Sequence, residues 1–293
     1  MTIPYVTRDD EQTFAPPYVQ AGCALHGFAL PAERARLQAL VDRYLVLPSE
    51  GRVPAVVEAD AVLLYFCDFA RSHSADVIDA RRGWLGEREC GVWVPIRRPG
   101  VRTPSFFVHT MIVDSGPAMC SGREVLGFPK QIGSIEVARD PERASTLAAD
   151  TLVCGDGRAD AGRWRPLVEL ERVEPAGDER GERLGALFEA LGLALAQGRE
   201  LLGGGALAAA RGELEFVNLK QFRDAADPRL ACYRAIVRSR ARLLGVQRVA
   251  ATPSYAYRLS PRASERLGVP ESGRTRGLFC EFDFELGLGE VLS

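Results

Sequence analysis

The sequence has few of the residues that build metal sites or disulfide frameworks. Its three histidines, His26, His73 and His109, are scattered, and no pair has the spacing of zinc ligands. We therefore expect no bound metal ion. The seven cysteines are widely separated and include no Cys-x-x-Cys pair. An odd number of distant cysteines in a long chain argues against structural disulfides, so we expect the reduced thiols of a cytoplasmic protein.

The sequence also lacks a large excess of positive or negative charge, and it has few long apolar runs. The net charge is −2 and the arginines are spread along the chain, which excludes the basic surface of a nucleic-acid-binding protein. Residues 1–5 lack the basic and apolar regions of a signal peptide. The most apolar long stretch, Leu184 to Leu202, is too short and too charged to cross a bilayer. We expect neither nucleic acid nor a membrane as a partner.

The usual nucleotide and nucleophile motifs are missing as well. The segment Gly155-Asp156-Gly157 does not continue into a Gly-x-Gly-x-x-Gly fingerprint, and Gly203-Gly204-Gly205 is not followed by the lysine of a phosphate-binding loop. The chain contains no Gly-x-Ser-x-Gly nucleophile turn. We therefore expect no cofactor, and the chemistry has to come from side chains.

Hydrophobic periodicity predicts a β-rich α+β fold in a single domain. Residues 1–20 are polar and rich in proline, which is typical of an irregular arm, and residues 21–293 contain no linker that would divide them. Helices are predicted from Pro31 to about Tyr44 and from Glu182 to Leu202. A hairpin turn is predicted at residues 155–158, and Cys232–Leu244 is left open between strand and helix. Strands are predicted at Cys23–Leu30, Val56–Phe69, Gly91–Ile96, Ser105–Val113, Ser134–Ala138, Ser145–Cys154, Arg163–Arg172, Leu214–Phe222, Gln247–Leu259 and Leu278–Leu286.

The segment from Gly122 to Gly133 contains the strongest chemical signal. Gly127 and Pro129 constrain the backbone, so we expect Lys130 to lie on a turn. Loss of hydration among apolar neighbours lowers the pKa of a lysine, and the free amine can attack a ketone to form a Schiff base. The neighbours predicted to provide this apolar surface are Leu126, Phe128 and Ile132.

Two motifs in this part of the chain resemble those of the acetoacetate decarboxylase family. Gly122-Arg123-Glu124, followed after four residues by Pro129-Lys130, is similar to the family's Schiff-base motif. Upstream, Glu89-Cys90-Gly91 and Pro95 match a Glu-x-Gly-x-x-x-Pro strand. The resemblance implies a cone-like, mixed β-barrel with a few packing helices, Lys130 as nucleophile and Glu89 facing it. It also implies a small keto acid as substrate and a homo-oligomer.

The resemblance is incomplete around the lysine. Gln131 stands where the family's decarboxylases have a second lysine, and Tyr65 stands where they have a second pocket glutamate. The stretch from Tyr18 to His26 offers no counterpart of their pocket arginine. Without a second cation, desolvation alone would have to lower the pKa of Lys130. Besides Gln131, we predict that the substrate pocket includes Arg123, Glu124 and Phe128.

These observations predict a lyase that forms a Schiff base through Lys130, with Glu89 moving protons. The reaction is left open between decarboxylation of a β-keto acid and aldol and dehydration chemistry on a 2-keto acid. The alternative is a barrel that binds or cyclises a hydrophobic polyketide-like ligand without an imine. In that case Lys130 would only donate hydrogen bonds.

Overall fold

One β-sheet forms most of the protein in a computed structural model, which describes residues 4–153, 163–175 and 212–293. Within these ranges the sheet has 12 strands and includes both parallel and antiparallel pairs. The strands are β1 (Tyr18–Pro31), β2 (Val56–Val57), β3 (Ala61–Ser74), β4 (Leu85–Arg97), β5 (Ser105–Val113), β6 (Lys130–Glu136), β7 (Thr146–Val153), β8 (Arg163–Arg172), β9 (Glu213–Arg223), β10 (Ala231–Leu259), β11 (Ser272–Leu286) and β12 (Glu290–Val291).

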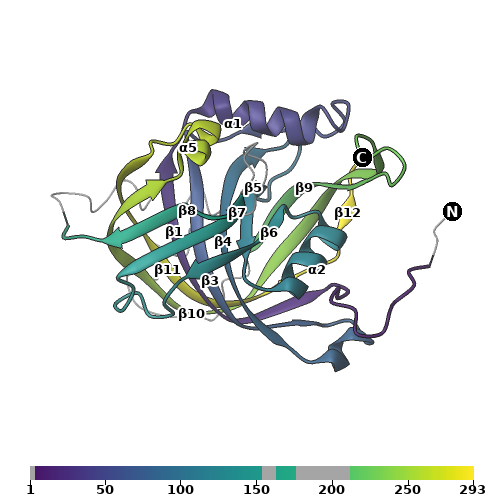
Figure 1. Cartoon of the computed structure of the whole chain (residues 1–293), viewed down its shortest axis with the longest axis horizontal. Coiled ribbons are helices and arrows are strands. Elements are labelled where there is room, and N and C mark those ends of the chain that lie inside the picture. The colour runs from purple at the N-terminus through teal and green to yellow at the C-terminus, as the bar shows by residue number, and fades with distance from the viewer. Residues whose placement is uncertain (1–3, 154–162, 176–211) are drawn as a thin grey trace.

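The sheet curves until it closes on itself (Figure 1). Its strand order is β2-β4-β3-β1-β11-β10-β8-β7-β6-β5-β9, and a further pairing of β4 with β5 completes the ring. Strand β9 pairs with both β5 and β10. Only the pairs β5–β6 and β5–β9 are parallel among the described strand pairs. The expectation of a β-rich α+β fold with a mixed sheet is confirmed.

The described helices are few and short. Helix α1 (Arg34–Val41) continues as a π-helical turn, η1 (Asp42–Val46), and packs near α5 (Pro261–Leu267) at one end of the ring. Figure 1 shows α2 (Gly116–Leu126) at the side of the ring that carries β6 and β9. A single 3₁₀ turn, η2 (Asp79–Arg82), precedes β4. In the part of the chain that the structure describes, no helix combines the length and apolar character of a membrane span.

Alternation along the strands separates two hydrophobic cores. In β3, Val62, Leu64 and Phe66 join the core that includes α1, whereas Leu63 and Tyr65 face the interior of the ring. All five side chains are almost completely buried. The prediction that this apolar run is buried on both faces is confirmed, and the period of two decides which residues can reach the interior.

Several element boundaries differ from those predicted. Strand β1 begins at Tyr18, within the predicted arm, because residues 18–20 already pair with β3 and β11. The undecided Cys232–Leu244 and the strand predicted at Gln247–Leu259 form one long strand, β10. Helices α2 and α5 were missed. The helix predicted at Glu182–Leu202 and the turn at residues 155–158 lie outside the described residues.

A buried carboxylate forms ion pairs and a hydrogen bond that join neighbouring segments of the ring, where β4 and β5 approach β9 and β10. Glu215 of β9 is fully buried, and its Oε1 lies 2.6 Å from Arg98 Nη2. The same oxygen accepts a hydrogen bond of 2.9 Å from Ser105 Oγ, while Oε2 lies 3.3 Å from Arg238 Nη1. Each partner comes from a different part of the ring. This cluster therefore links four neighbouring segments through one side chain.

We predict that Glu215→Ala lowers the free energy of unfolding by about 3–5 kcal/mol, because Arg98 would remain buried without its partner. Urea unfolding followed by circular dichroism measures this loss. The matched control is Glu290→Gln, which removes an exposed partner of Arg238 and should cost about 1 kcal/mol or less. Equal effects of the two substitutions would contradict the role assigned to Glu215.

Candidate functional site

Lys130 reaches the interior of the ring because a helix and a tight link precede it. Ser115 caps the N-terminus of α2 through its side chain, and Pro117 occupies the first turn. Gly127 ends the helix with φ of 73°, a left-handed conformation that glycine adopts without a steric penalty. Lys130 is then the first residue of β6. The prediction that it lies on a turn is therefore corrected: the turn ends just before it.

Two carboxylates of β4 face the amine. Glu89 Oε2 lies 2.9 Å from Lys130 Nζ, and Glu87 Oε1 lies 3.9 Å from it. The two glutamates are two residues apart, so strand alternation points them to the same side. Tyr65 of β3 donates its hydroxyl proton to Glu89 Oε1. All four residues are buried, with 1–9% of their surface exposed.

Two glycines, which have no side chain, make room for the side chains of Tyr65 and Lys130. Gly91 pairs with Tyr65 across the strands, and a Cβ on Gly91 would lie 2.5 Å from the tyrosine ring. A Cβ on Gly122 of α2 would lie 2.6 Å from Cδ of Lys130. Both glycines belong to the two motifs in the sequence. Their missing side chains let the phenol reach Glu89 and let the lysine side chain lie against α2.

The charges of this cluster oppose the effect of burial on the amine. Burial lowers the pKa of Lys130, but the neighbouring charges of Glu87 and Glu89, with the hydrogen bond to Glu89, raise it above its ordinary value. The expectation of a pKa lowered by desolvation is thus wrong for the unliganded protein. Burial raises the pKa of Glu87 to about 7, against the attraction of Lys130. The cluster holds an ammonium beside a carboxylate, and a second carboxyl that can keep its proton near neutral pH.

The amine opens onto a cavity of about 360 Å³ inside the ring. Its walls are mostly apolar. Aromatic side chains line the cavity near the cluster, and these are Tyr65, Trp93 and Phe216 from strands and Phe128 from the link between α2 and β6. The wall formed by β10 and β11 consists of Ala241, Leu243, Leu278, Cys280, Phe282, Phe284 and Leu286. A reacting carbonyl at Lys130 would therefore be largely shielded from water.

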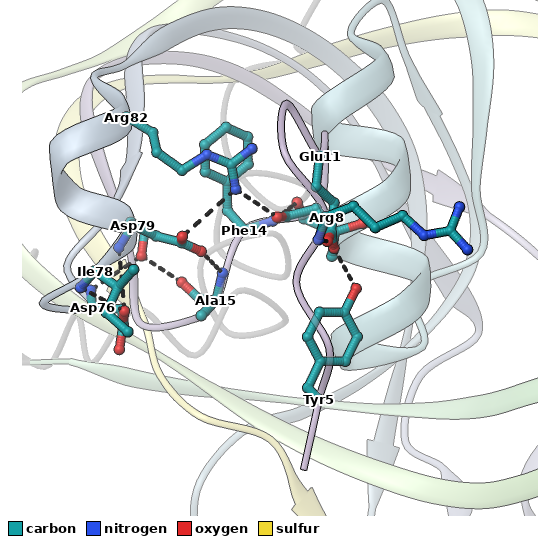
Figure 2. Close-up of polar contacts among 12 residues, drawn as sticks. Tyr5, Arg8, Glu11, Phe14, Ala15, Asp76, Ile78, Asp79 and Arg82 are labelled. Carbon is teal, nitrogen blue, oxygen red and sulfur yellow. Dashed lines mark hydrogen bonds and ion pairs between the residues drawn. The ribbon is translucent and has the colours of Figure 1, made fainter.

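The N-terminal arm contributes Phe14 to the wall of this cavity. Figure 2 shows the polar contacts of the arm beside Phe14. Phe14 lines the cavity, and its backbone N–H donates to Ser121 Oγ of α2 at 2.9 Å. The guanidinium carbon of Arg82 lies 4.2 Å from the centre of the Phe14 ring, within the range of a cation–π contact. Next to it, Ala15 N–H donates to Asp79 Oδ2 at 2.7 Å. The arm is thus held on one side by α2 and on the other by η2.

Three of the predicted pocket residues do not line the cavity. Gln131 follows Lys130 in β6, so alternation turns its side chain outward, where it is exposed. Arg123 and Glu124 lie on the exposed face of α2. Arg123 Nη1 donates to the carbonyl of Lys130 at 3.1 Å, and Glu124 accepts a hydrogen bond from Thr13 of the arm. Of the predicted site residues, Lys130, Glu89 and Phe128 line the cavity.

Sequence reasoning missed Glu87 and Arg82. The strand predicted at Gly91–Ile96 begins in fact at Leu85, and Glu87, two residues before Glu89 in it, therefore shares the face of Glu89. Arg82 lies between Phe14 and Asp79 in the structure, and no local pattern in the sequence predicts that contact. Tyr255 lies in the core, where its hydroxyl donates to the carbonyl of Ala144.

The described residues contain no group of three or more His, Cys, Asp or Glu side chains that could hold a metal ion. An amine in hydrogen-bond contact with a carboxylate can exchange a proton with it, and a buried amine beside an apolar cavity can meet a carbonyl carbon.

The comparison with solved structures gives fold matches that span almost the whole chain. The acetoacetate decarboxylase of Legionella pneumophila has a TM-score of 0.57 at 14% identity, covering 100% of this chain and 92% of that one. An acetoacetate decarboxylase-like enzyme from Sphingomonas wittichii has a TM-score of 0.55 at 14% identity, covering 99% and 98%. The enduracididine biosynthesis enzyme MppR in complex with pyruvate has a TM-score of 0.54 at 15% identity, covering 97% and 93%.

At these identities the solved structures show the fold alone. A comparison with curated protein sequences gives no match. The sequence itself settles the family, because the family model described as acetoacetate decarboxylase (ADC) matches residues 2–293. This range includes the buried lysine, both carboxylates and every strand of the ring. The chain belongs to the acetoacetate decarboxylase family.

Proposed function

We propose that this protein is a carbon–carbon lyase that forms a Schiff base with a keto acid through Lys130. The observation that carries the proposal is the position of the amine, which lies 2.9 Å from Glu89 at the wall of an apolar cavity. Membership of the acetoacetate decarboxylase family supports it. The chain has only two lysines, Lys130 and Lys220, and only Lys130 lies in the cluster.

The first step is the loss of a proton from the amine. Lys130 is protonated in the resting cluster, so Glu89 accepts the proton as the nitrogen attacks the carbonyl carbon of the substrate. One of the two protons left on the nitrogen moves to the carbonyl oxygen, which becomes the hydroxyl of a carbinolamine. Glu89 or the protonated form of Glu87 then gives a proton to this hydroxyl, which leaves as water. Burial raises the pKa of Tyr65 well above its ordinary value, so its phenol stays protonated and keeps Glu89 in place.

The protonated imine then acts as an electron sink for the neighbouring bond. From a β-keto acid, carbon dioxide leaves and the enamine takes up a proton at carbon. From a 2-keto acid, loss of a proton gives an enamine that attacks an aldehyde, and water can then be lost. The solved complexes of MppR with pyruvate and with the condensation product of pyruvate and imidazole 4-carboxaldehyde support the second route. The family match supports the first.

A cytoplasmic location and a homo-oligomeric state also remain predictions. The family resemblance in the sequence is the only basis for the oligomer, and size-exclusion chromatography with light scattering measures it directly. A monomer at micromolar concentration would contradict this part of the proposal without affecting the chemistry assigned to Lys130.

We predict that cyanoborohydride in the presence of a keto acid adds the mass of the reduced substrate to Lys130. Acetoacetate and pyruvate are the two probes, and peptide mass spectrometry locates the adduct. Lys130→Arg should abolish the adduct, because a guanidinium stays protonated and does not form an imine.

The matched control is Lys220→Arg, which changes the only other lysine and should leave the adduct intact. Its amine donates to the carbonyl of Val125 at 3.2 Å, outside the cluster. An adduct with pyruvate but not acetoacetate would favour the aldol route, and the reverse would favour decarboxylation. The absence of any adduct at Lys130 would overturn the imine and favour a barrel that binds or cyclises a hydrophobic ligand.

We predict that Glu87→Gln shifts the pH dependence of imine formation toward lower pH. The negative charge of Glu87 raises the pKa of Lys130, so its removal lets desolvation lower that pKa. The free amine then forms at lower pH, and the acidic limb of the rate profile moves in the same direction. The initial rate of adduct formation between pH 5 and pH 9 provides the measurement.

Glu89→Gln provides the contrast, because it removes the proton acceptor as well as a charge. Loss of a positioned general base should slow imine formation by about 10²–10⁴-fold at every pH. If Glu87→Gln moved the limb toward higher pH, or if the two variants had the same profile, the roles assigned to the two carboxylates would be wrong.

A further inference from the structure

The part of β11 that lines the cavity has one entirely apolar face, which we call the β11 face. Every second residue from Leu278 to Leu286 lines the cavity, and these are Leu278, Cys280, Phe282, Phe284 and Leu286. The residues between them include three acidic side chains, Glu281, Asp283 and Glu285. Within residues 278–286, the alternation therefore places all of the charge on one side of the strand and none on the side that faces the cavity.

This face lies away from the reactive amine around the ring. The strand order β4-β3-β1-β11-β10 separates it from the carboxylates of β4 by β3 and β1. Phe282 and Phe284 stack with their ring centres 5.7 Å apart, and Leu243 of β10 is opposite Phe284 in the register. The cavity thus has the charged cluster on one wall and an aromatic and aliphatic surface on another.

The cavity is larger than a short keto acid requires. Its volume is about 360 Å³. Pockets of this size and apolar character commonly hold ligands of the size of drug molecules. A short acid such as acetoacetate, held at Lys130, would leave the β11 face in contact with water. Apolar surface that stays in contact with water contributes nothing to affinity.

We propose that the physiological substrate is a keto compound with a phenyl-sized or longer apolar group, which packs on Phe282, Phe284 and Leu243 while its carbonyl reaches Lys130. This proposal rests on the imine chemistry proposed for Lys130 and adds the substrate class. The β11 face and the amine are then two ends of one binding site, and the length of the apolar group determines which carbonyl compounds are processed.

The test compares matched pairs of substrates in the cyanoborohydride assay. Pyruvate is paired with phenylpyruvate, and acetoacetate with 3-oxo-3-phenylpropanoate. Burial of a phenyl ring should lower the concentration that gives half-maximal adduct on Lys130 by about tenfold or more in at least one pair. Equal or weaker capture of the aryl compound in both pairs would overturn this proposal and leave the imine chemistry standing. No adduct with any of the four would overturn the imine chemistry itself.

A pair of variants on β10 tests where the apolar group binds. Leu243→Trp fills space beside Phe284 and should weaken capture of the aryl compounds more than capture of the short acids, so that the preference for the aryl compounds is lost. Leu244→Trp is the matched control, because the next residue is 48% exposed and does not line the cavity. It should keep the preference, and both variants should keep the wild-type circular dichroism spectrum. If Leu243→Trp retained the preference, the assignment to the β11 face would be wrong.

Discussion

The ion pair between Lys130 and Glu89 is the contact on which the site depends. Both groups are buried, and each would be costly to desolvate alone. Glu87 adds a second carboxyl, whose pKa of about 7 lets it stay partly protonated and limits the negative charge in the cavity. The reactivity proposed for the amine therefore comes from moving one proton within the cluster. This arrangement differs from one in which apolar surroundings alone keep the lysine amine neutral.

The register of the sheet brings the cluster together from distant parts of the chain. Met111 of β5 is aligned with Gly91 of β4 on one side and with Lys130 of β6 on the other. The backbone of Lys130 is therefore level with Gly91, and the lysine side chain extends from there to Glu89. A shift of either pairing by one residue would turn the lysine or the carboxylates to the opposite face. The cluster around Glu215 joins β5 and the end of β4 to β9 and β10 near the opposite ends of β4 and β5.

The parts of the fold and of the site that depend on short sequence patterns could be predicted from the sequence. The strand at Ser105–Val113 follows from its β-branched and aromatic residues, and the facing of Lys130 and Glu89 followed from two motifs at a family-like spacing. The structure corrects the predictions that depend on how distant segments pack together. Helix α2 was missed because glycine and proline in its sequence suggest a turn, although they lie at positions where a helix tolerates them. The direction of the pKa shift of Lys130 depends on the short distances from its amine to both Glu87 and Glu89, and these distances are set by the pairing of the strands.

The close approach of Gly122 to the lysine side chain makes this one position informative about other members of the family. Any substituent at the matching residue of a relative would occupy the space of the lysine methylenes and push the nitrogen away from its acid partners. Relatives that keep a hydrogen there can retain a nucleophile in this geometry. Those that carry a bulkier group must place their amine elsewhere or use the ring for another purpose, so the residue offers a simple criterion for sorting sequences before any assay.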